Sequence, residues 1–333
     1  MDTSRLSRSV ALLAAALAVT MGAAACGGAK GESADGPITV KEGAIGDDIS
    51  FEMQYVADKD GFFKKQGLKT EEVNTSSGVS ATQALISGDL DVVNAGGSEI
   101  LKAIGKGAKL KIIAPDIETF PYLLVSGKSI TSPTQLKGKA VGISTVGSSS
   151  YYGVVSGLQA LGVPKDSVSL RQVGGESARL GAVASGAVAA TAVGAQLKSG
   201  VEKAHLNVLA NLASDHIAYA QDYLVTTEKF ISDHPGFVAK YRKGLEQARA
   251  FLFDPKNKTE VLKDLRDLFQ VDENSPVPED AYEYTQQEKG PYLFPEGLKV
   301  SQKVFENTVK LTGVDVGDRS LKDIVADGVP LTE

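Results

Sequence analysis

Short runs of β-branched and aliphatic residues alternate with glycine-led helical stretches from residue 38 to about residue 226. This alternation is typical of parallel sheets with helices on both faces, so it predicts an α/β fold. A helix that starts directly after a strand has free N–H groups, so each strand end is a polar rim that can hold a ligand. The predicted strands are residues 38–40, 70–73, 90–94, 110–114, 123–126, 140–144, 168–173 and 189–193.

Apolar residues recur with a helical period over residues 148–161, where Val154 and Leu158 share one face and Ser148 can cap the N-terminus. After residue 226 the pattern becomes mainly helical. One helix should begin near Pro235, where proline suits the first turn. Further helices are predicted over residues 262–269, 279–287 and 298–311.

The first 25 residues have the composition of an export signal. Arg5 and Arg8 precede the apolar run 10–21, which is shorter than the roughly 20 residues of a spanning helix, and small residues follow at 22–25. Cys26, the single cysteine of the chain, comes next, and we expect it to carry a lipid. The alternative is an ordinary secretory signal with an accidental cysteine.

Residues 26–36 are polar and rich in glycine, which predicts a flexible tether behind the lipid. The whole chain has a net charge of -6, and loss of the signal leaves it at -7 because the signal carries a net +1. No basic cluster stands out, which argues against a nucleic-acid partner. A length near 300 residues favours two domains, and a lone cysteine cannot form an internal disulfide.

Several short motifs follow one another along the chain. Phe62 and Phe63 should pack the first helix, and Gly88 should provide a turn. The motifs are ADKDGFFKKQGL at 57–68, ALISGDLDV at 84–92, LKGKAVG at 136–142, GAVASGAV at 181–188 and FISDHP at 230–235.

Together these motifs resemble the solute-binding proteins of ABC importers for nitrate, taurine, alkanesulfonates and thiamine-pyrimidine precursors. The resemblance implies an α/β, two-lobed periplasmic-binding-protein fold of type II-like form, with hinged lobes and a central ligand cleft. It places one lobe at 37–121 plus 224–333 and the other at 122–223. The chain would cross between them near 119–123 and 218–224, and closure about these hinges would bury a small solute.

The resemblance also implies a function. The protein would be a lipid-anchored monomer on the outer face of the cytoplasmic membrane, delivering a small organic solute or anion to an ABC permease without catalysis or a cofactor. One alternative is an exported sensor on the same fold, and a more distant one is an exported enzyme. His205, His216 and His234 are dispersed without ligand spacing, so we expect no metal site.

Two serine-rich rims are the first candidates for solute contact. Ser76 and Ser77 end a strand in the first lobe, while Gly147, Ser148 and Ser149 do so in the second. Hydroxyl and free N–H groups there can bind a sulfonate, nitrate, phosphate or carboxylate. The competing interpretation is ordinary N-capping.

Two glutamates lie beside predicted helix starts, one in each lobe. Gly97, Ser98 and Glu99 belong to the first rim, and Glu176 belongs to the second. Each acid could instead stabilise the helix dipole. If both line the cleft, a simple anion becomes a poor solute, and an amine or a molecule with several donors is favoured. Arg179 has the opposite sign and could pair with Glu176 or meet an anionic group.

The remaining candidates are polar or aromatic residues near the same rims. A tyrosine after Ser149 can lie over a solute, but in a first helical turn it is as often a packed edge residue. The loop after the first strand and the second crossing supply the others. These residues are Tyr151, Tyr152, Asp47, Asp48, Ser50, Tyr219 and Gln221.

Overall fold

The computed structural model describes residues 36–44, 48–287 and 292–333. The predicted signal segment 1–25, the lipidation site Cys26 and the tether up to residue 35 lie outside the described residues, as does Asp47. Residues from Gly36 to Glu333 form one compact unit. No helix within the described ranges is long and apolar enough to span a membrane.

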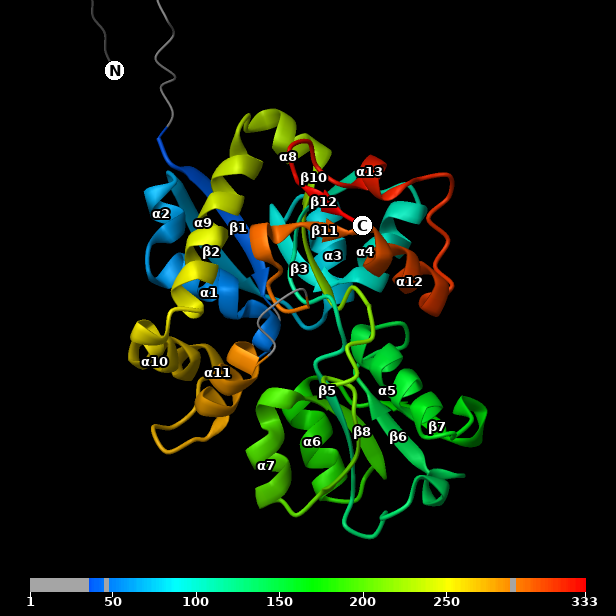
Figure 1. The fold of residues 1–333 in the computed structure, drawn as a ribbon. Coiled ribbons are helices and arrows are strands. Elements are labelled where there is room, and N and C mark those ends of the chain that lie inside the picture. The colour runs from blue at the N-terminus through cyan, green and yellow to red at the C-terminus, as the bar shows by residue number, and fades with distance from the viewer. Residues whose placement is uncertain (1–35, 45–47, 288–291) are drawn as a thin grey trace, which may run out of the picture. The chain divides into compact units, whose positions relative to one another are not determined.

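Two five-stranded sheets form the centre of this unit (Figure 1). The first has the order β2-β1-β3-β10-β4, and β10 runs antiparallel to both of its neighbours. We call the part of the chain around this sheet lobe 1. Its strands are β1 (Ile38–Ala44), β2 (Leu68–Asn74), β3 (Val92–Gly96), β4 (Leu110–Pro115) and β10 (Asp222–Thr227).

The second sheet has the order β7-β6-β8-β5-β9, with β5 antiparallel to β8 and β9. We call the part around it lobe 2. Its strands are β5 (Tyr122–Ser126), β6 (Ala140–Ile143), β7 (Ser169–Gln172), β8 (Ala190–Gly194) and β9 (Asn207–Asn211). A separate pair, β11 (Val300–Ser301) and β12 (Leu331–Thr332), lies near the C-terminus.

Helices cover both sheets, and those after β10 pack mainly on lobe 1 (Figure 1). Lobe 1 carries η1 (Ile49–Phe51), α1 (Glu52–Lys59), α2 (Phe62–Lys65), α3 (Gly78–Ser87), α4 (Gly97–Gly105), α8 (Glu228–Asp233), α9 (Phe237–Leu252), η5 (Pro255–Asn257), α10 (Lys258–Phe269), α11 (Val277–Gln287), η6 (Glu296–Leu298), α12 (Gln302–Thr312) and α13 (Leu321–Ile324). Lobe 2 carries η2 (Pro133–Leu136), α5 (Ser149–Ala160), η3 (Lys165–Ser167), α6 (Glu176–Ala184), η4 (Ala195–Leu197) and α7 (Lys198–Lys203).

Each lobe has its own hydrophobic core. In lobe 2 the side chains of β5 alternate, so that Leu124 packs with α5 on one face while Leu123 and Val125 pack with α6 and α7 on the other. In lobe 1 the predicted packing of Phe63 is confirmed, since its buried ring stacks on Tyr241 of α9 with 4.6 Å between centroids. These cores hold in place the strand ends that face one another across the two lobes.

The eight predicted strands all coincide with β1 to β8, and α5 begins after Ser148 as predicted. Gly88 ends α3 with a φ of 86°, which confirms the predicted turn. Strands β9 and β10 were not predicted. The second of these begins inside the stretch 218–224, which we had assigned to a crossing.

The predicted helix 298–311 was wrong at its start. Gly297 has a φ of 67°, which breaks the helical path, and Val300–Ser301 pairs with β12. Helix α12 therefore begins at Gln302, where the side chain of Ser301 accepts a hydrogen bond from the N–H of Val304. A helical period alone could not show that a distant C-terminal strand competes for these residues.

Candidate functional site

A pocket of about 130 Å³ lies between the two lobes, where the ends of several strands face one another. Lobe 1 contributes the segments that follow β2 and β3, and lobe 2 contributes those that follow β6 and β7. The start of β10 closes the pocket at the second crossing, through Gln221 and Asp222. The pocket thus occupies the position expected for a ligand of an open α/β sheet.

Four helices begin at the wall of this pocket. Helix α3 starts behind Ser77, whose side chain accepts a hydrogen bond from the N–H of Ser80, and α5 starts behind Ser148, which caps Tyr151. Helices α4 and α6 start behind Gly96 and Gly175, neither of which offers a side-chain cap. The two glycine starts leave backbone N–H groups without a capping side chain.

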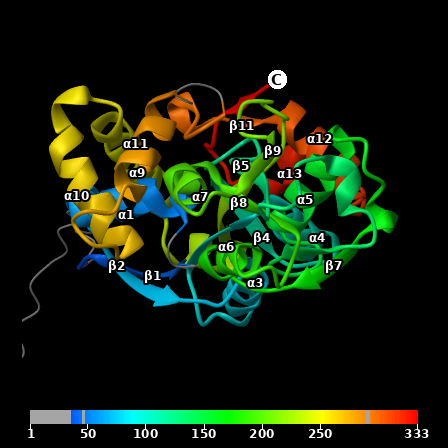
Figure 2. The same cartoon turned by 90° about the horizontal axis from the view of Figure 1, so that it is seen from below.

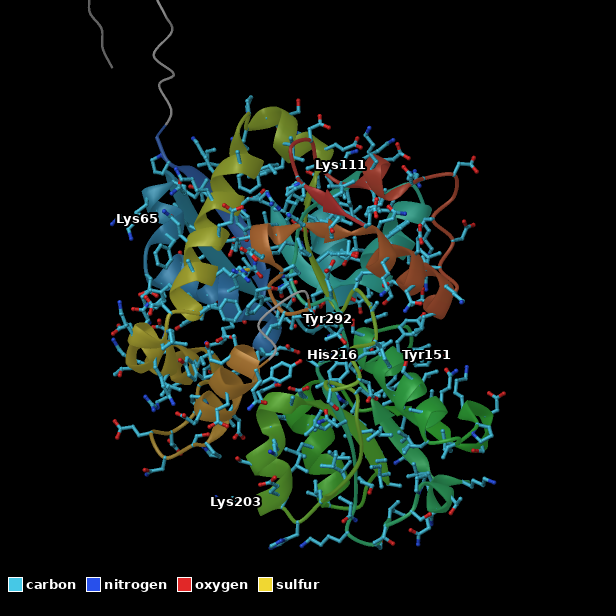
Figure 3. The ribbon with its side chains drawn as sticks, viewed as in Figure 1. Lys65, Lys111, Tyr151, Lys203, His216 and Tyr292 are labelled. Carbon is cyan, nitrogen blue, oxygen red and sulfur yellow. The ribbon has the colours of Figure 1, made fainter. Side chains whose placement is uncertain are left out.

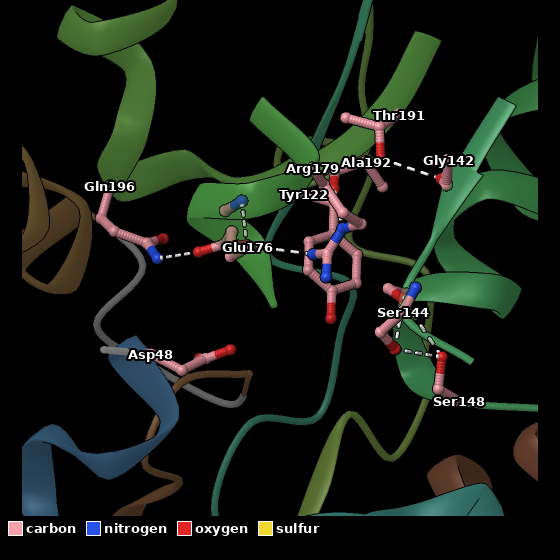
Figure 4. Close-up of polar contacts among 12 residues, drawn as sticks. Asp48, Tyr122, Gly142, Ser144, Ser148, Glu176, Arg179, Thr191, Ala192 and Gln196 are labelled. Atoms are coloured by element: carbon pink, nitrogen blue, oxygen red, sulfur yellow. Dashed lines mark hydrogen bonds and ion pairs between the residues drawn. The ribbon is translucent and has the colours of Figure 1, made fainter. Parts of the chain in front are cut away.

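The serines of lobe 2 are bonded mainly to one another (Figure 4). The hydroxyl of Ser144 donates to Ser148 Oγ at 2.8 Å, and Ser148 Oγ donates to the carbonyl of Thr145 at 2.8 Å. Ser150 Oγ accepts from the N–H of Ser144 at 2.9 Å. These hydroxyls shape the wall, and much of their hydrogen-bonding capacity is used within the lobe.

Glu176 and Arg179 form a buried pair inside lobe 2 (Figure 4). The carboxylate of Glu176 accepts from the N–H of Gly194 at 2.6 Å and from Nε2 of Gln196 at 2.7 Å. Arg179 lies 3.6 Å from Glu176 and donates to the carbonyls of Ala192 and Gly174. Both charges are therefore matched within their own lobe.

Lobe 1 brings three further acids to the pocket, namely Asp48, Glu99 and Asp222. The hydroxyl oxygen of Ser50 lies 2.6 Å from Asp222 Oδ2 and 2.9 Å from Asp48 Oδ1. One hydroxyl carries a single proton, so it can donate to only one of these carboxylates at a time. The two acids consequently compete for this hydroxyl, and Asp48 Oδ1 also accepts from the N–H of Ser50 at 2.9 Å.

Glu99 lies over the start of helix α3. A side chain at Gly78 would meet the Glu99 carboxylate, which would have to shift from its present position. Burial raises the pKa of Glu99 to about 7, although the N–H of Gly96 donates to it and acts in the opposite direction. Burial also raises the pKa of Asp222 well above its usual range, and the nearby carboxylate of Asp48 adds to that rise.

Asp116 stands behind these acids on β4's C-terminal side and is fully buried. Asn94 donates to its Oδ2 at 2.7 Å, while its Oδ1 has no hydrogen-bond partner among the described residues. Burial raises its pKa well above the usual value, and Asp48 contributes to the same effect. Lobe 1 therefore gathers four acidic side chains at or behind the pocket, and burial favours the protonated form of three of them, Glu99, Asp116 and Asp222.

Of the predicted site residues, the structure brings several to the pocket wall. They come from both serine rims, both glutamate rims and the second crossing: Ser76, Ser77, Glu99, Ser148, Ser149, Glu176 and Arg179, together with Asp48 and Gln221.

Other predicted residues lie beside the pocket rather than in its wall. Ser50 stands behind Asp48 and Asp222. Ser98 donates to the carbonyl of Gly147 at 3.2 Å, and the hydroxyl of Tyr219 lies 3.3 Å from Ser98 Oγ. Gly97 packs so closely on Ala220 that a side chain would collide with it. Together with the bond from Ser149 Oγ to the carbonyl of Gln221, these residues join the lobes.

Tyr151 and Tyr152 lie outside the pocket wall. Their rings meet edge to face with 5.0 Å between centroids, and Lys165 lies over the Tyr151 ring. The hydroxyl of Tyr152 donates to the carbonyl of Thr312 at 3.4 Å. Figure 3 shows Tyr151 on the lobe 2 side of the junction between the lobes. Both tyrosines pack at the edge of lobe 2, and their contact with a solute stays a prediction.

Sequence reasoning missed several residues of the wall, above all Tyr122 and Asp222. Tyr122 lies at the first crossing and Asp222 at the second, and the sequence pattern is interrupted at both. Tyr122 accepts a hydrogen bond from Gln221 Nε2 at 2.7 Å, which links one crossing to the other. An acid directly before the apolar run YLVTT was the one available signal for Asp222.

Comparisons with known proteins agree with this architecture. A family model described as NMT1/THI5 like matches residues 49–258. The alkanesulfonate-binding protein SsuA from Xanthomonas axonopodis pv. citri bound to MOPS is 18% identical, with a TM-score of 0.69, over 88% of this chain and 99% of that one. No curated protein sequence matches the chain.

Two further structures have the same fold. The periplasmic aliphatic sulphonate binding protein SsuA from Escherichia coli is 16% identical, with a TM-score of 0.68, over 86% of this chain and 99% of that one. The periplasmic nitrate-binding protein NrtA from Synechocystis PCC 6803 is also 16% identical, with a TM-score of 0.62, over 78% of this chain and 72% of that one. The predicted two-lobed α/β fold is thereby confirmed.

Proposed function

We propose, since this chain belongs to the NMT1/THI5-like family, that it is the exported solute receptor of an ABC importer. Its fold is that of solute-binding proteins of ABC import systems. The observation that carries the proposal is the pocket between the lobes, which is lined by helix starts from both sheets. Such a pocket can bind a small polar solute through the N-terminal ends of these helices and the nearby side chains.

Delivery to a permease requires that binding change the outer surface of the receptor. Two chain crossings connect the lobes, and a few cross-lobe hydrogen bonds hold them together. We infer that the lobes open and close about these crossings and that the closed form is the one the permease recognises. Release of the solute would then follow from separation of the lobes.

This function is tested by looking for a small molecule that the purified protein carries. We expect mass spectrometry of denatured protein to release a small molecule, and the same molecule to raise the thermal midpoint of the stripped protein by several degrees. Conversion of that molecule during overnight incubation would instead indicate an enzyme. Two negative results together would contradict the receptor role. The first is that no molecule is released, and the second is that deletion of a permease gene next to the gene of this chain leaves solute uptake unchanged.

One cross-lobe contact should report on closure directly. Asp280 of α11 accepts from the N–H of Ser199 at 2.9 Å and from its hydroxyl at 2.7 Å, and Figure 2 shows α11 beside α7. Replacing Asp280 with alanine should weaken solute binding by roughly fivefold, because about 1 kcal/mol of hydrogen bonding in the closed form is lost. Glu283→Ala, an exposed position on the same helix, is the matched control. Equal affinities of both variants, measured by calorimetry, would show that this contact does not favour closure.

Anchoring at Cys26 is the remaining part of the proposal. A Cys26→Ser variant should lose its acyl chain and move from the membrane fraction to the soluble one, because the tether itself offers little to bind a bilayer. Fractionation with labelled palmitate measures this shift. A variant that stays in the membrane fraction would point to an uncleaved signal segment instead.

A further inference from the structure

The charge of the pocket sets a limit on its solute, provided that the proposed receptor role holds. Four acidic side chains line the pocket, while Arg179 is the one basic side chain among the described residues of its wall. Arg179 is only 4% exposed, and its donors are directed at Glu176 and at two backbone carbonyls. The guanidinium is therefore already neutralised within lobe 2 and offers little to an anionic solute.

No basic side chain of lobe 1 stands among the described residues of the pocket wall. Asp48 and Asp222 share the single proton of Ser50, and Asp116 adds a third carboxylate behind them. Burial opposes ionisation of Asp222, and the surrounding carboxylates oppose it further. A positive group in the pocket would relieve this repulsion, whereas a sulfonate or nitrate would add to it.

A second observation points to a solute with hydrogen-bond donors. Gln221 lines the pocket and is only 3% exposed, and its side-chain oxygen has no hydrogen-bond partner among the described residues. Its amide nitrogen already donates to Tyr122, so the free atom is an acceptor. A buried acceptor without a donor costs free energy, so a solute that donates there gains affinity.

The volume of the pocket limits the part of the solute that it encloses. A cavity of about 130 Å³ is close to the ~150 Å³ cavity that holds a benzene molecule in another protein. The enclosed part should then contain roughly six non-hydrogen atoms by this comparison. A short aliphatic amine or the amine end of a slightly larger molecule has this size.

We propose that the solute carries a protonated amine, which binds against the carboxylates of Asp222 and Glu99 and donates to the side-chain oxygen of Gln221. The ammonium group supplies three donors and a full positive charge, which fits both the acidic wall and the free acceptor. This solute class differs from the sulfonate and nitrate named for the two kinds of structural neighbour. These two proteins are 18% and 16% identical to this chain, and proteins with the same fold can have pocket walls of different charge.

A panel of four-carbon probes, with nitrate added as a small anion, tests the class. Butylamine and putrescine should raise the thermal midpoint of the stripped protein, whereas butanol, butanesulfonate and nitrate at the same concentration should not. Stabilisation by butanesulfonate or nitrate without any response to amines would overturn the amine inference and leave the receptor role intact. A flat response to both amines would also overturn it, while a molecule released from purified protein would still support the receptor.

Variants locate the binding group. Asp222→Asn should weaken putrescine binding at least tenfold in calorimetry, because the amide cannot ionise against the ammonium group, while its oxygen can still accept from Ser50. Glu118→Gln is the matched control, since Glu118 is a buried acid outside the pocket wall. Glu99→Gln repeats the test if Asp222→Asn fails to fold. Unchanged putrescine affinity in the folded pocket variant would remove these carboxylates from the site.

Discussion

Replacing Arg179 with methionine should lower the free energy of unfolding by about 3 to 5 kcal/mol, the usual cost of removing one partner of a buried pair. Glu176 would keep its two hydrogen bonds but lose its positive partner. The carbonyls of Ala192 and Gly174 would also lose their donor. Methionine preserves the apolar stem, so the loss reflects the guanidinium rather than packing.

Urea unfolding of two variants separates this effect from a general loss of arginine. Arg171→Met removes an exposed guanidinium of β7, which donates to the carbonyl of Ala187, and should cost less than about 1 kcal/mol. Similar losses in Arg171→Met and Arg179→Met would mean that the buried pair has no special role. A large loss confined to Arg179→Met would show that the pocket wall of lobe 2 depends on it.

The stability of the solute-free protein should fall as the pH rises from about 4.5 to 8, and Glu99→Gln should remove part of that fall. Burial raises the pKa of Glu99 from 4.5 to about 7, so the folded state binds more protons than the unfolded state in this range. The free energy of unfolding then decreases with rising pH. Burial opposes ionisation of Glu99, while the N–H of Gly96, which donates to its carboxylate, favours it.

The expected difference between wild type and Glu99→Gln is close to zero at pH 4.5 and reaches about 3 kcal/mol in favour of the variant at pH 8. Glu42, Glu52 and Glu118 have pKa values raised to about 8 and steepen the fall in both proteins equally. Urea unfolding at several pH values measures the difference. Glu273→Gln, in an exposed loop, is the control and should follow wild type. Parallel curves for wild type and Glu99→Gln would show that Glu99 ionises freely.

The alternation of apolar runs with helical stretches was sufficient to predict strands β1 to β8, because each is either largely buried or followed by a helix within a few residues. Strand β10 could not be found in the same way. Its position between β3 and β4 comes from a pairing with residues more than a hundred positions earlier, and local sequence does not encode that distance. Strand β9 has a half-exposed edge pattern that gives a weak signal.

Prediction of the site had a similar limit. The serine and glutamate rims could be found because each follows a predicted strand and opens a helix. Tyr122 and Asp222 lie at the crossings, where the position of a side chain depends on how the two lobes meet. The pairing of Glu176 with Arg179 was one of two alternatives, and the sequence alone could not show that β8 and η4 supply the other partners of the acid.

The insertion of β10 into the first sheet also imposes an order on synthesis. The strands of lobe 2 occupy one uninterrupted stretch, from Tyr122 to Asn211, so this lobe can complete its sheet as soon as that stretch is available. Lobe 1 must wait, because β3 and β4 are joined only through β10. During emergence of the chain, lobe 2 therefore acquires its complete sheet first, and its folding draws the ends of the two crossings together before the last central strand of lobe 1 is placed.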